Sequence, residues 1–183
     1  MLNLAFDNVL RVYELWKDEL FTSEEKLEMS LQILLRNYKL VKKFTVQDKS
    51  DLLKAIFENF ISLNTRESGD SEKNFDFIQD ANYIFASFLM DYGIDLIDQQ
   101  GLLHWWKFIS LFQGLSERTK IREVIGIRTR KIPEANKYNA DEIRALQELK
   151  ALYALEISQE EQEIQFEKGL DKLARALEQR AVK

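Results

Sequence analysis

The scarcity of glycine and proline constrains the fold of this chain more than any other feature of its sequence. Only six glycines and one proline, Pro133, occur among its 183 residues. Turn-rich β proteins need both residue types, whereas helix interiors tolerate neither well. Apolar residues make up 45% of the chain, enough to bury a core, and charged residues make up 31%, which suits helices with solvated outer faces. We therefore predict an all-α protein.

Capping signals and apolar side chains at helical spacing place the first helices. One is predicted from about Asn8 to Leu20, with Asp7 as its cap. Thr22 and Glu25 have the spacing of a capping box, which predicts a second helix start. A third helix is predicted to begin after Thr45.

The next block combines an expected loop with the most apolar helices of the chain. Residues 64–74 carry no apolar side chain and are predicted to form a solvated loop. A broad apolar face then runs from Phe77 to Leu89, and this helix should end at Gly93 in a left-handed conformation. A second apolar helix, within 102–112, is expected to end in the same way at Gly114, with Ser116 capping the helix that follows.

Pro133 divides the chain into two predicted parts. Residues 1–133 are expected to form a compact multi-helix bundle, and residues 134–183 a long C-terminal helical arm that starts near Asn139. Within the arm, four apolar residues repeat at the spacing of a coiled-coil seam. They are Phe166, Leu170, Leu173 and Leu177. This seam is a candidate surface for protein partners or for other copies of the chain. Binding of other copies would make the protein a homo-oligomer. Alternatively, the arm folds back on its own bundle.

The residues needed for common catalytic and metal sites are largely missing. There is no cysteine and only one histidine, His104, so a second imidazole cannot share acid–base work. Asp91, Asp95 and Asp98 lack the spacing of a calcium loop and are interpreted as helix caps and turn residues. We expect no enzyme activity, no catalytic residue, no cofactor and no metal.

Basic side chains gather between two acidic regions. The net charge is −5, but residues 116–133 hold six basic and two acidic side chains. Four arginines of this segment are candidate partner-binding residues: Arg118, Arg122, Arg128 and Arg130. Contacts within the chain or with an acidic protein are favoured over nucleic acid, because nucleic-acid binders usually show a broader positive surface.

Adjacent tryptophans mark the second apolar helix. Trp105 and Trp106 point roughly 100° apart on a helix, so both are buried only if that helix is packed on two sides. At least one is expected in the core, and the other is left open between the core and a protein contact.

Residues 75–133 resemble a family of small phage and prophage proteins from Gram-positive hosts. The shared pattern is an aromatic–acidic start, a YGIDL turn, an LHWWKF helix that ends in GL, and an arginine after it. The main motif residues are Tyr92, Gly93, Ile94, Asp95, Leu96, His104, Trp105, Trp106, Phe108, Gly114 and Leu115. Asp80, Ala86, Phe88 and Arg128 also match.

The resemblance implies a role in building phage tails. Genes of this family typically lie between those of the major tail protein and the tape-measure protein, the position of tail assembly chaperones. Such a protein would bind tape-measure and tail-tube proteins in the host cytoplasm and be absent from the finished virion. Proteins of this family have no known catalytic residue, cofactor or metal. Two alternatives are a structural tail or connector subunit retained in the virion and a small nucleic-acid-binding regulator that uses residues 118–131.

Two further features favour the cytoplasm. The N-terminal residues lack a basic region followed by an uninterrupted apolar stretch, so no signal peptide is expected. No segment approaches the ~18–20 consecutive apolar residues of a membrane span.

Overall fold

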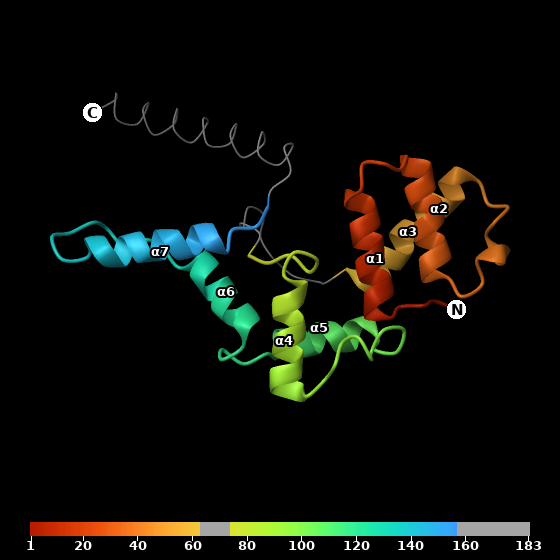
Figure 1. The fold of residues 1–183 in the computed structure, drawn as a ribbon. Coiled ribbons are helices and arrows are strands. Elements are labelled where there is room, and N and C mark those ends of the chain that lie inside the picture. The colour runs from red at the N-terminus through yellow and green to blue at the C-terminus, as the bar shows by residue number, and fades with distance from the viewer. Residues whose placement is uncertain (63–73, 157–183) are drawn as a thin grey trace, which may run out of the picture.

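The computed structural model describes residues 1–62 and 74–156, and over these ranges the protein is all-α, as predicted (Figure 1). No β-strand occurs in them, and the extended backbone forms only isolated bridges. The helices are α1 (Phe6–Lys17), α2 (Ser23–Leu34), α3 (Val46–Ile56), α4 (Ala81–Tyr92), α5 (Trp105–Gln113), α6 (Lys120–Thr129) and α7 (Ala140–Leu152). A short 3-10 helix, η1 (Tyr38–Leu40), precedes α3, and a π-helical turn, η2 (Phe57–Ile61), follows it.

The helices form three consecutive groups along the molecule (Figure 1). Helices α1, α2 and α3 pack together at one end, α4 and α5 lie in the middle, and α6 and α7 extend to the other end. Helix α1 also packs against α5, and α4 against α6, so each group contacts the next. Residues 63–73 and 157–183 lie outside the described structure, and with them most of the predicted loop.

The extended N-terminus ties the first group to the middle of the molecule. The Asn3 amide donates to the Leu34 carbonyl at the end of α2, over 2.8 Å. Farther along, the Phe6 amide donates to the Leu103 carbonyl over 2.9 Å, and the Trp105 amide donates to the Leu4 carbonyl over 2.8 Å. Residues 3–6 therefore connect the end of α2 to the start of α5 through backbone hydrogen bonds.

This pairing corrects the predicted start of the first helix. Helix α1 begins at Phe6 and ends at Lys17, with Ala5 and not Asp7 at its N-cap. The helix starts where the backbone pairing with residues 103–105 stops, a long-range contact that helical spacing does not reveal. The Asp7 carboxylate instead accepts a hydrogen bond from the Gly101 amide, 2.8 Å away.

Capping boxes open the next two helices. In α2, Thr22 and Glu25 form the predicted box. Hydrogen bonds from the backbone and side chain of Thr22 hold the pKa of the Glu25 carboxyl below its usual value. In α3, Thr45 is the N-cap, as predicted, and Asp48 completes a second box. Local sequence therefore fixes both helix starts.

Phe108 lies at the centre of the aromatic core. Its ring is stacked on Phe6 from α1 at 4.9 Å between centroids and on Phe88 from α4 at 5.2 Å. Trp105 stacks on it from the preceding turn of α5, and its Nε1–H donates to the Ile61 carbonyl over 2.9 Å. Three segments of the chain therefore share one set of aromatic contacts.

A left-handed glycine was predicted at the end of both α4 and α5, and it occurs only in α4. Helix α4 ends at Tyr92, and Gly93 has the predicted left-handed conformation with φ +63°. The helix begins at Ala81 and not at Phe77, which lies in the turn before it. Gly114 at the end of α5 is not left-handed, with φ −83°. A Cβ atom there would lie 3.1 Å from the Tyr92 hydroxyl, so a close approach explains this glycine.

The start of α6 depends on another helix and not on Ser116. The Ser116 amide and hydroxyl both bond to Asp91, and a turn separates this serine from the helix. The Ile121 amide in the first turn of α6 donates to the buried Ser87 hydroxyl of α4, over 3.1 Å. Thr119 and not Ser116 is the N-cap of α6, and a buried side chain from a neighbouring helix satisfies one amide of its first turn.

Helix α7 packs on α6 through the first part of the predicted arm. It begins at Ala140, close to the predicted start, but the Asn139 side chain makes no cap bond to the helix. The Tyr153 hydroxyl accepts a hydrogen bond from Lys120 Nζ over 2.8 Å, and this bond holds the pKa of Lys120 above its usual value. Residues 140–156 therefore contact the rest of the protein.

Candidate protein-binding groove

Tyr92 and Gly114 of the family motif form a joint between α4 and α5. The Tyr92 hydroxyl donates to the Leu111 carbonyl, 2.9 Å away, and lies against Gly114. Leu96 and Leu115 are also buried. These motif positions therefore contribute packing and helix geometry.

His104 is a structural residue of α5. It is the N-cap of this helix, and its Nδ1 accepts a hydrogen bond from the Trp106 amide over 3.2 Å. Trp105 is 1% exposed and Trp106 is 38% exposed. The structure thus places one tryptophan in the core and leaves the other partly on the surface.

Asp91 and Asp95 accept hydrogen bonds from backbone amides. Asp91 accepts from the Ser116 amide, and Asp95 accepts from the Ile97 amide over 2.8 Å. No cluster of three or more possible metal ligands occurs in residues 1–62 and 74–156. Asp95 is a turn residue, as interpreted, whereas Asp91 lies within α4 and bonds the distant Ser116 instead of capping a helix.

Two of the four candidate arginines are used within the chain. Arg122 donates to the Gln113 carbonyl at the end of α5, where a cation is favoured by the helix dipole. Arg128 is almost fully covered and makes a salt bridge, described next. Arg118 and Arg130 lie on the surface. The expected cluster of four partner-binding arginines is therefore reduced to two exposed ones.

Arg128 joins three parts of the chain. Its Nη1 and Nη2 atoms donate to the two carboxylate oxygens of Asp80 over 2.7 and 2.8 Å, in a bidentate pair. The Asp80 side chain is almost completely buried, which makes the pair hard to solvate. The Arg128 guanidinium also donates to the carbonyls of Asn74 and Tyr153. This one side chain thus connects α6 to the start of α4 and the end of α7.

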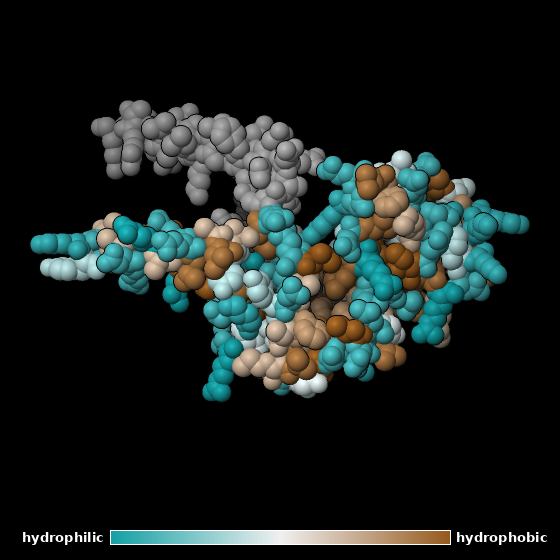
Figure 2. Space-filling view, viewed as in Figure 1, coloured by the Kyte–Doolittle hydropathy of each residue, from teal (hydrophilic) through white to brown (hydrophobic). Residues whose placement is uncertain are grey.

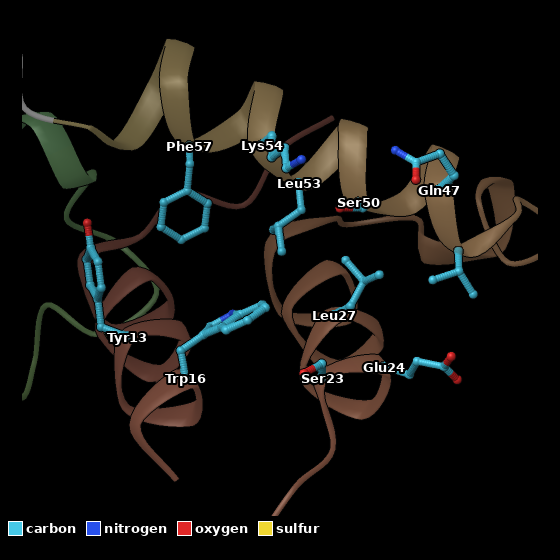
Figure 3. Close-up of a pocket in the computed structure, with 11 residues that line it drawn as sticks. Tyr13, Trp16, Ser23, Glu24, Leu27, Gln47, Ser50, Leu53, Lys54 and Phe57 are labelled. Carbon is cyan, nitrogen blue, oxygen red and sulfur yellow. The ribbon is translucent and has the colours of Figure 1, made fainter. Parts of the chain in front are cut away.

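The four arm residues predicted to bind partners, Phe166, Leu170, Leu173 and Leu177, lie outside the described residues. An apolar hollow lies elsewhere, at the N-terminal end of the molecule (Figure 3). It is a groove of about 580 Å³ between α1, α2 and α3. Its lining residues are Tyr13, Trp16, Ser23, Glu24, Leu27, Val46, Gln47, Ser50, Leu53, Lys54 and Phe57.

Aromatic and aliphatic side chains converge on this groove, hereafter the α1–α3 groove. Tyr13 projects from α1 toward Phe57 of η2, and the Trp16 indole extends from α1 toward Leu27 of α2 (Figure 3). Trp16 is 44% exposed and Val46 is 54% exposed. Burial raises the pKa of the Tyr13 hydroxyl. A preformed apolar surface is therefore open to solvent.

The groove is rigidly built. The Trp16 Nε1–H donates to the Ser30 hydroxyl over 3.0 Å, which fixes the indole between α1 and α2. Capping boxes stabilise the starts of α2 and α3, the helices that form the other two walls. Figure 2 shows apolar side chains gathered over this end of the molecule, whereas the far end of α7 is mainly hydrophilic.

Sequence reasoning missed this groove. Tyr13 and Trp16 lie three residues apart on α1, and Val46 occupies the first position of α3. Each pattern alone is normal for a core helix, so only the three-helix arrangement reveals that part of this apolar surface is uncovered. An exposed valine at a helix start was the one local signal.

Comparisons with known proteins identify one family. Residues 1–155 match the model of the family described as Bacteriophage Gp15 protein. Neither the curated proteins nor the solved structures gave a significant match. Within residues 1–62 and 74–156, no helix has the length and hydropathy needed to cross a membrane.

Proposed function

The chain belongs to the bacteriophage Gp15 protein family, and on this premise we propose that it is a non-catalytic tail assembly chaperone. In this role it binds the tape-measure protein, the tail-tube protein or both in the host cytoplasm, and it leaves before the virion is complete. The observation that carries the proposal is the open, apolar α1–α3 groove.

The shape of the groove suits an apolar helix. Its lining on α3 and the start of η2 extends from Val46 to Phe57, eleven residues apart. At about 1.5 Å per residue this distance is roughly 16 Å, or three turns of a helix. A helix that presents apolar residues at positions i, i+3, i+4 and i+7 would cover such a surface. Long tail proteins that carry apolar helical stripes need such cover until they assemble.

The contacts of the basic segment weaken the nucleic-acid alternative. Arg122 and Arg128 donate to partners within the chain, which leaves Arg118 and Arg130 as the exposed arginines of the candidate set. Nucleic-acid affinity depends on the number of phosphates that are neutralised, so two exposed arginines give little. Protein binding through the groove is the better supported function.

Co-expression with tape-measure fragments tests the proposal. The wild-type protein is expected to raise the soluble yield of these fragments severalfold, whereas Val46→Asp should lose most of this effect. Val46 is the first residue of α3, where a carboxylate is compatible with the helix dipole, so the variant should still fold. Soluble and insoluble fractions are compared on gels.

Leu152→Asp is the matched control. Leu152 is 71% exposed on α7, so this variant adds the same charge at an exposed apolar residue away from the groove. It should support solubility as well as the wild type does. If wild-type protein leaves fragment solubility unchanged, the chaperone role fails. If Val46→Asp is as active as Leu152→Asp, the groove is not the binding surface.

A further inference from the structure

A basic loop leads into one end of the α1–α3 groove. Residues 36–44, hereafter the basic loop, connect α2 to α3 and carry four basic side chains and no acidic one. The four are Arg36, Lys39, Lys42 and Lys43, and all of them are exposed. Because the whole chain has a net charge of −5, this loop is a local positive patch on an acidic protein.

The charges of the basic loop are not neutralised by the described part of the chain. The nearest acidic residues in the sequence already have partners, since Glu28 pairs with Lys49 at 2.7 Å and Asp48 bonds Thr45 in a capping box. Within residues 1–62 and 74–156, none of the four basic side chains makes a salt bridge. Their positive charge is therefore available to an acidic partner.

Apolar side chains of the basic loop continue the surface of the groove. Leu40 is 72% exposed and Phe44 is 47% exposed. Phe44 lies two residues before Val46, which lines the groove, and Lys43 lies three residues before it. With consecutive Cα atoms 3.8 Å apart, the Cα atoms of Lys43 and Val46 are separated by at most about 11 Å. The basic loop and the Val46 end of the groove are therefore neighbouring parts of one surface.

The two rims of the groove differ in charge. Lys54 lines the α3 side, eight residues after Val46, which corresponds to about 12 Å along a helix. The α2 side carries Glu24 instead. An acidic side chain on a bound helix is therefore favoured beside α3, where Lys54 and the basic loop lie, and disfavoured beside Glu24.

We infer that the client helix of the α1–α3 groove is amphipathic and carries acidic residues along one flank of its apolar stripe. This inference rests on the proposed function, which it deepens by stating the chemistry of the client. The apolar stripe covers Trp16 and Val46. On the flank beside α3, acidic residues about two turns apart face Lys54 and the basic loop.

A helical protein segment fits this surface better than other anionic partners do. A flat anionic bilayer would contact the basic loop but would not fill a groove of about 580 Å³. Nucleic-acid affinity depends on the number of phosphates that are neutralised, and the four cations of the basic loop give few such contacts. A helix supplies both the apolar stripe for the groove and the carboxylates for the loop.

Two synthetic peptides test the inference on the full-length protein. Both carry leucines at positions i, i+3, i+4, i+7 and i+11, and one flank carries either glutamates or lysines at a spacing of seven residues. Circular dichroism matches their helicity, and fluorescence anisotropy measures binding. At about 0.15 M salt we expect the wild type to bind the glutamate peptide about tenfold more tightly, and the preference should shrink at about 0.5 M salt because exposed charges are then screened.

A double variant assigns the preference to the basic loop. Lys42→Glu with Lys43→Glu should lose the preference for the glutamate peptide. Lys137→Glu with Arg144→Glu is the matched control, because it makes the same change in charge at two exposed residues at the α7 end of the molecule. This control should keep the wild-type preference, and circular dichroism checks that both variants are folded.

Four results would overturn the inference. Equal binding of the two peptides by the wild type means that an acidic flank is not selected, even if the loop variant fails to fold; the proposed function stands if Val46→Asp abolishes that binding. A preference that persists in the folded loop variant means that the basic loop does not select the client. Tighter binding of anionic phospholipid vesicles or of a single-stranded oligonucleotide than of the glutamate peptide assigns the loop to another partner. Binding of neither peptide counts against the groove itself, and with it the proposed function.

Discussion

Replacement of Arg128 by methionine is expected to lower the free energy of unfolding by about 3–5 kcal/mol. The Asp80 carboxylate, now buried with its bidentate partner, would lose the opposite charge while remaining out of water. The variant would also lose the hydrogen bonds from Arg128 to the carbonyls of Asn74 and Tyr153. Urea unfolding followed by circular dichroism measures the change.

Arg130→Met is the matched control for this variant. Arg130 belongs to the same basic segment but is exposed, so its replacement should change the unfolding free energy by no more than about 0.5 kcal/mol. Asp80→Asn, alone and combined with Arg128→Met, completes a double-mutant cycle. If Arg128→Met costs no more than Arg130→Met, Arg128 does not hold α4, α6 and α7 together.

Phe108→Ala is expected to destabilise the protein by about 3–5 kcal/mol, as large core truncations do. Phe108 is 1% exposed and stacks between Phe6 and Phe88, so its removal leaves a cavity bounded by rings from α1 and α4. These neighbours belong to separate helices and cannot collapse into the space without moving them. Thermal and urea unfolding both report the loss.

Trp106→Ala provides the comparison on the same helix. It removes a larger side chain, but Trp106 is 38% exposed, so much less apolar surface returns to water. We expect it to cost clearly less than Phe108→Ala. The opposite order of the two variants would show that the aromatic core is not centred on Phe108.

Local signals in the sequence predicted the fold class and several helix ends. The Thr22–Glu25 box, the cap at Thr45 and the left-handed Gly93 depend only on neighbouring residues, and all three occur. The errors came from long-range contacts. Ala5 replaces Asp7 as the cap of α1 because the N-terminus pairs with residues 103–105, and Ser87 of α4 bonds the start of α6.

The candidate site was harder to predict than the fold. Charge alone grouped four arginines, but Arg122 bonds the end of the preceding helix and Arg128 bonds Asp80, 48 residues away in the sequence. The α1–α3 groove needs three helices to form, and Trp16 and Val46 look like ordinary core residues in their own helices. A sequence pattern gives the apolar face of each helix, but it does not tell how much of that face its neighbours cover.

A tail assembly chaperone acts while tails are built and then leaves. Quantitative mass spectrometry of purified virions, compared with lysates in which tails are being built, measures this most directly. We expect peptides of this chain in the lysates, associated with tape-measure or tail-tube proteins, and none above background in the virions. Recovery from virions in a fixed ratio to the tail proteins would contradict the chaperone role and identify a structural subunit.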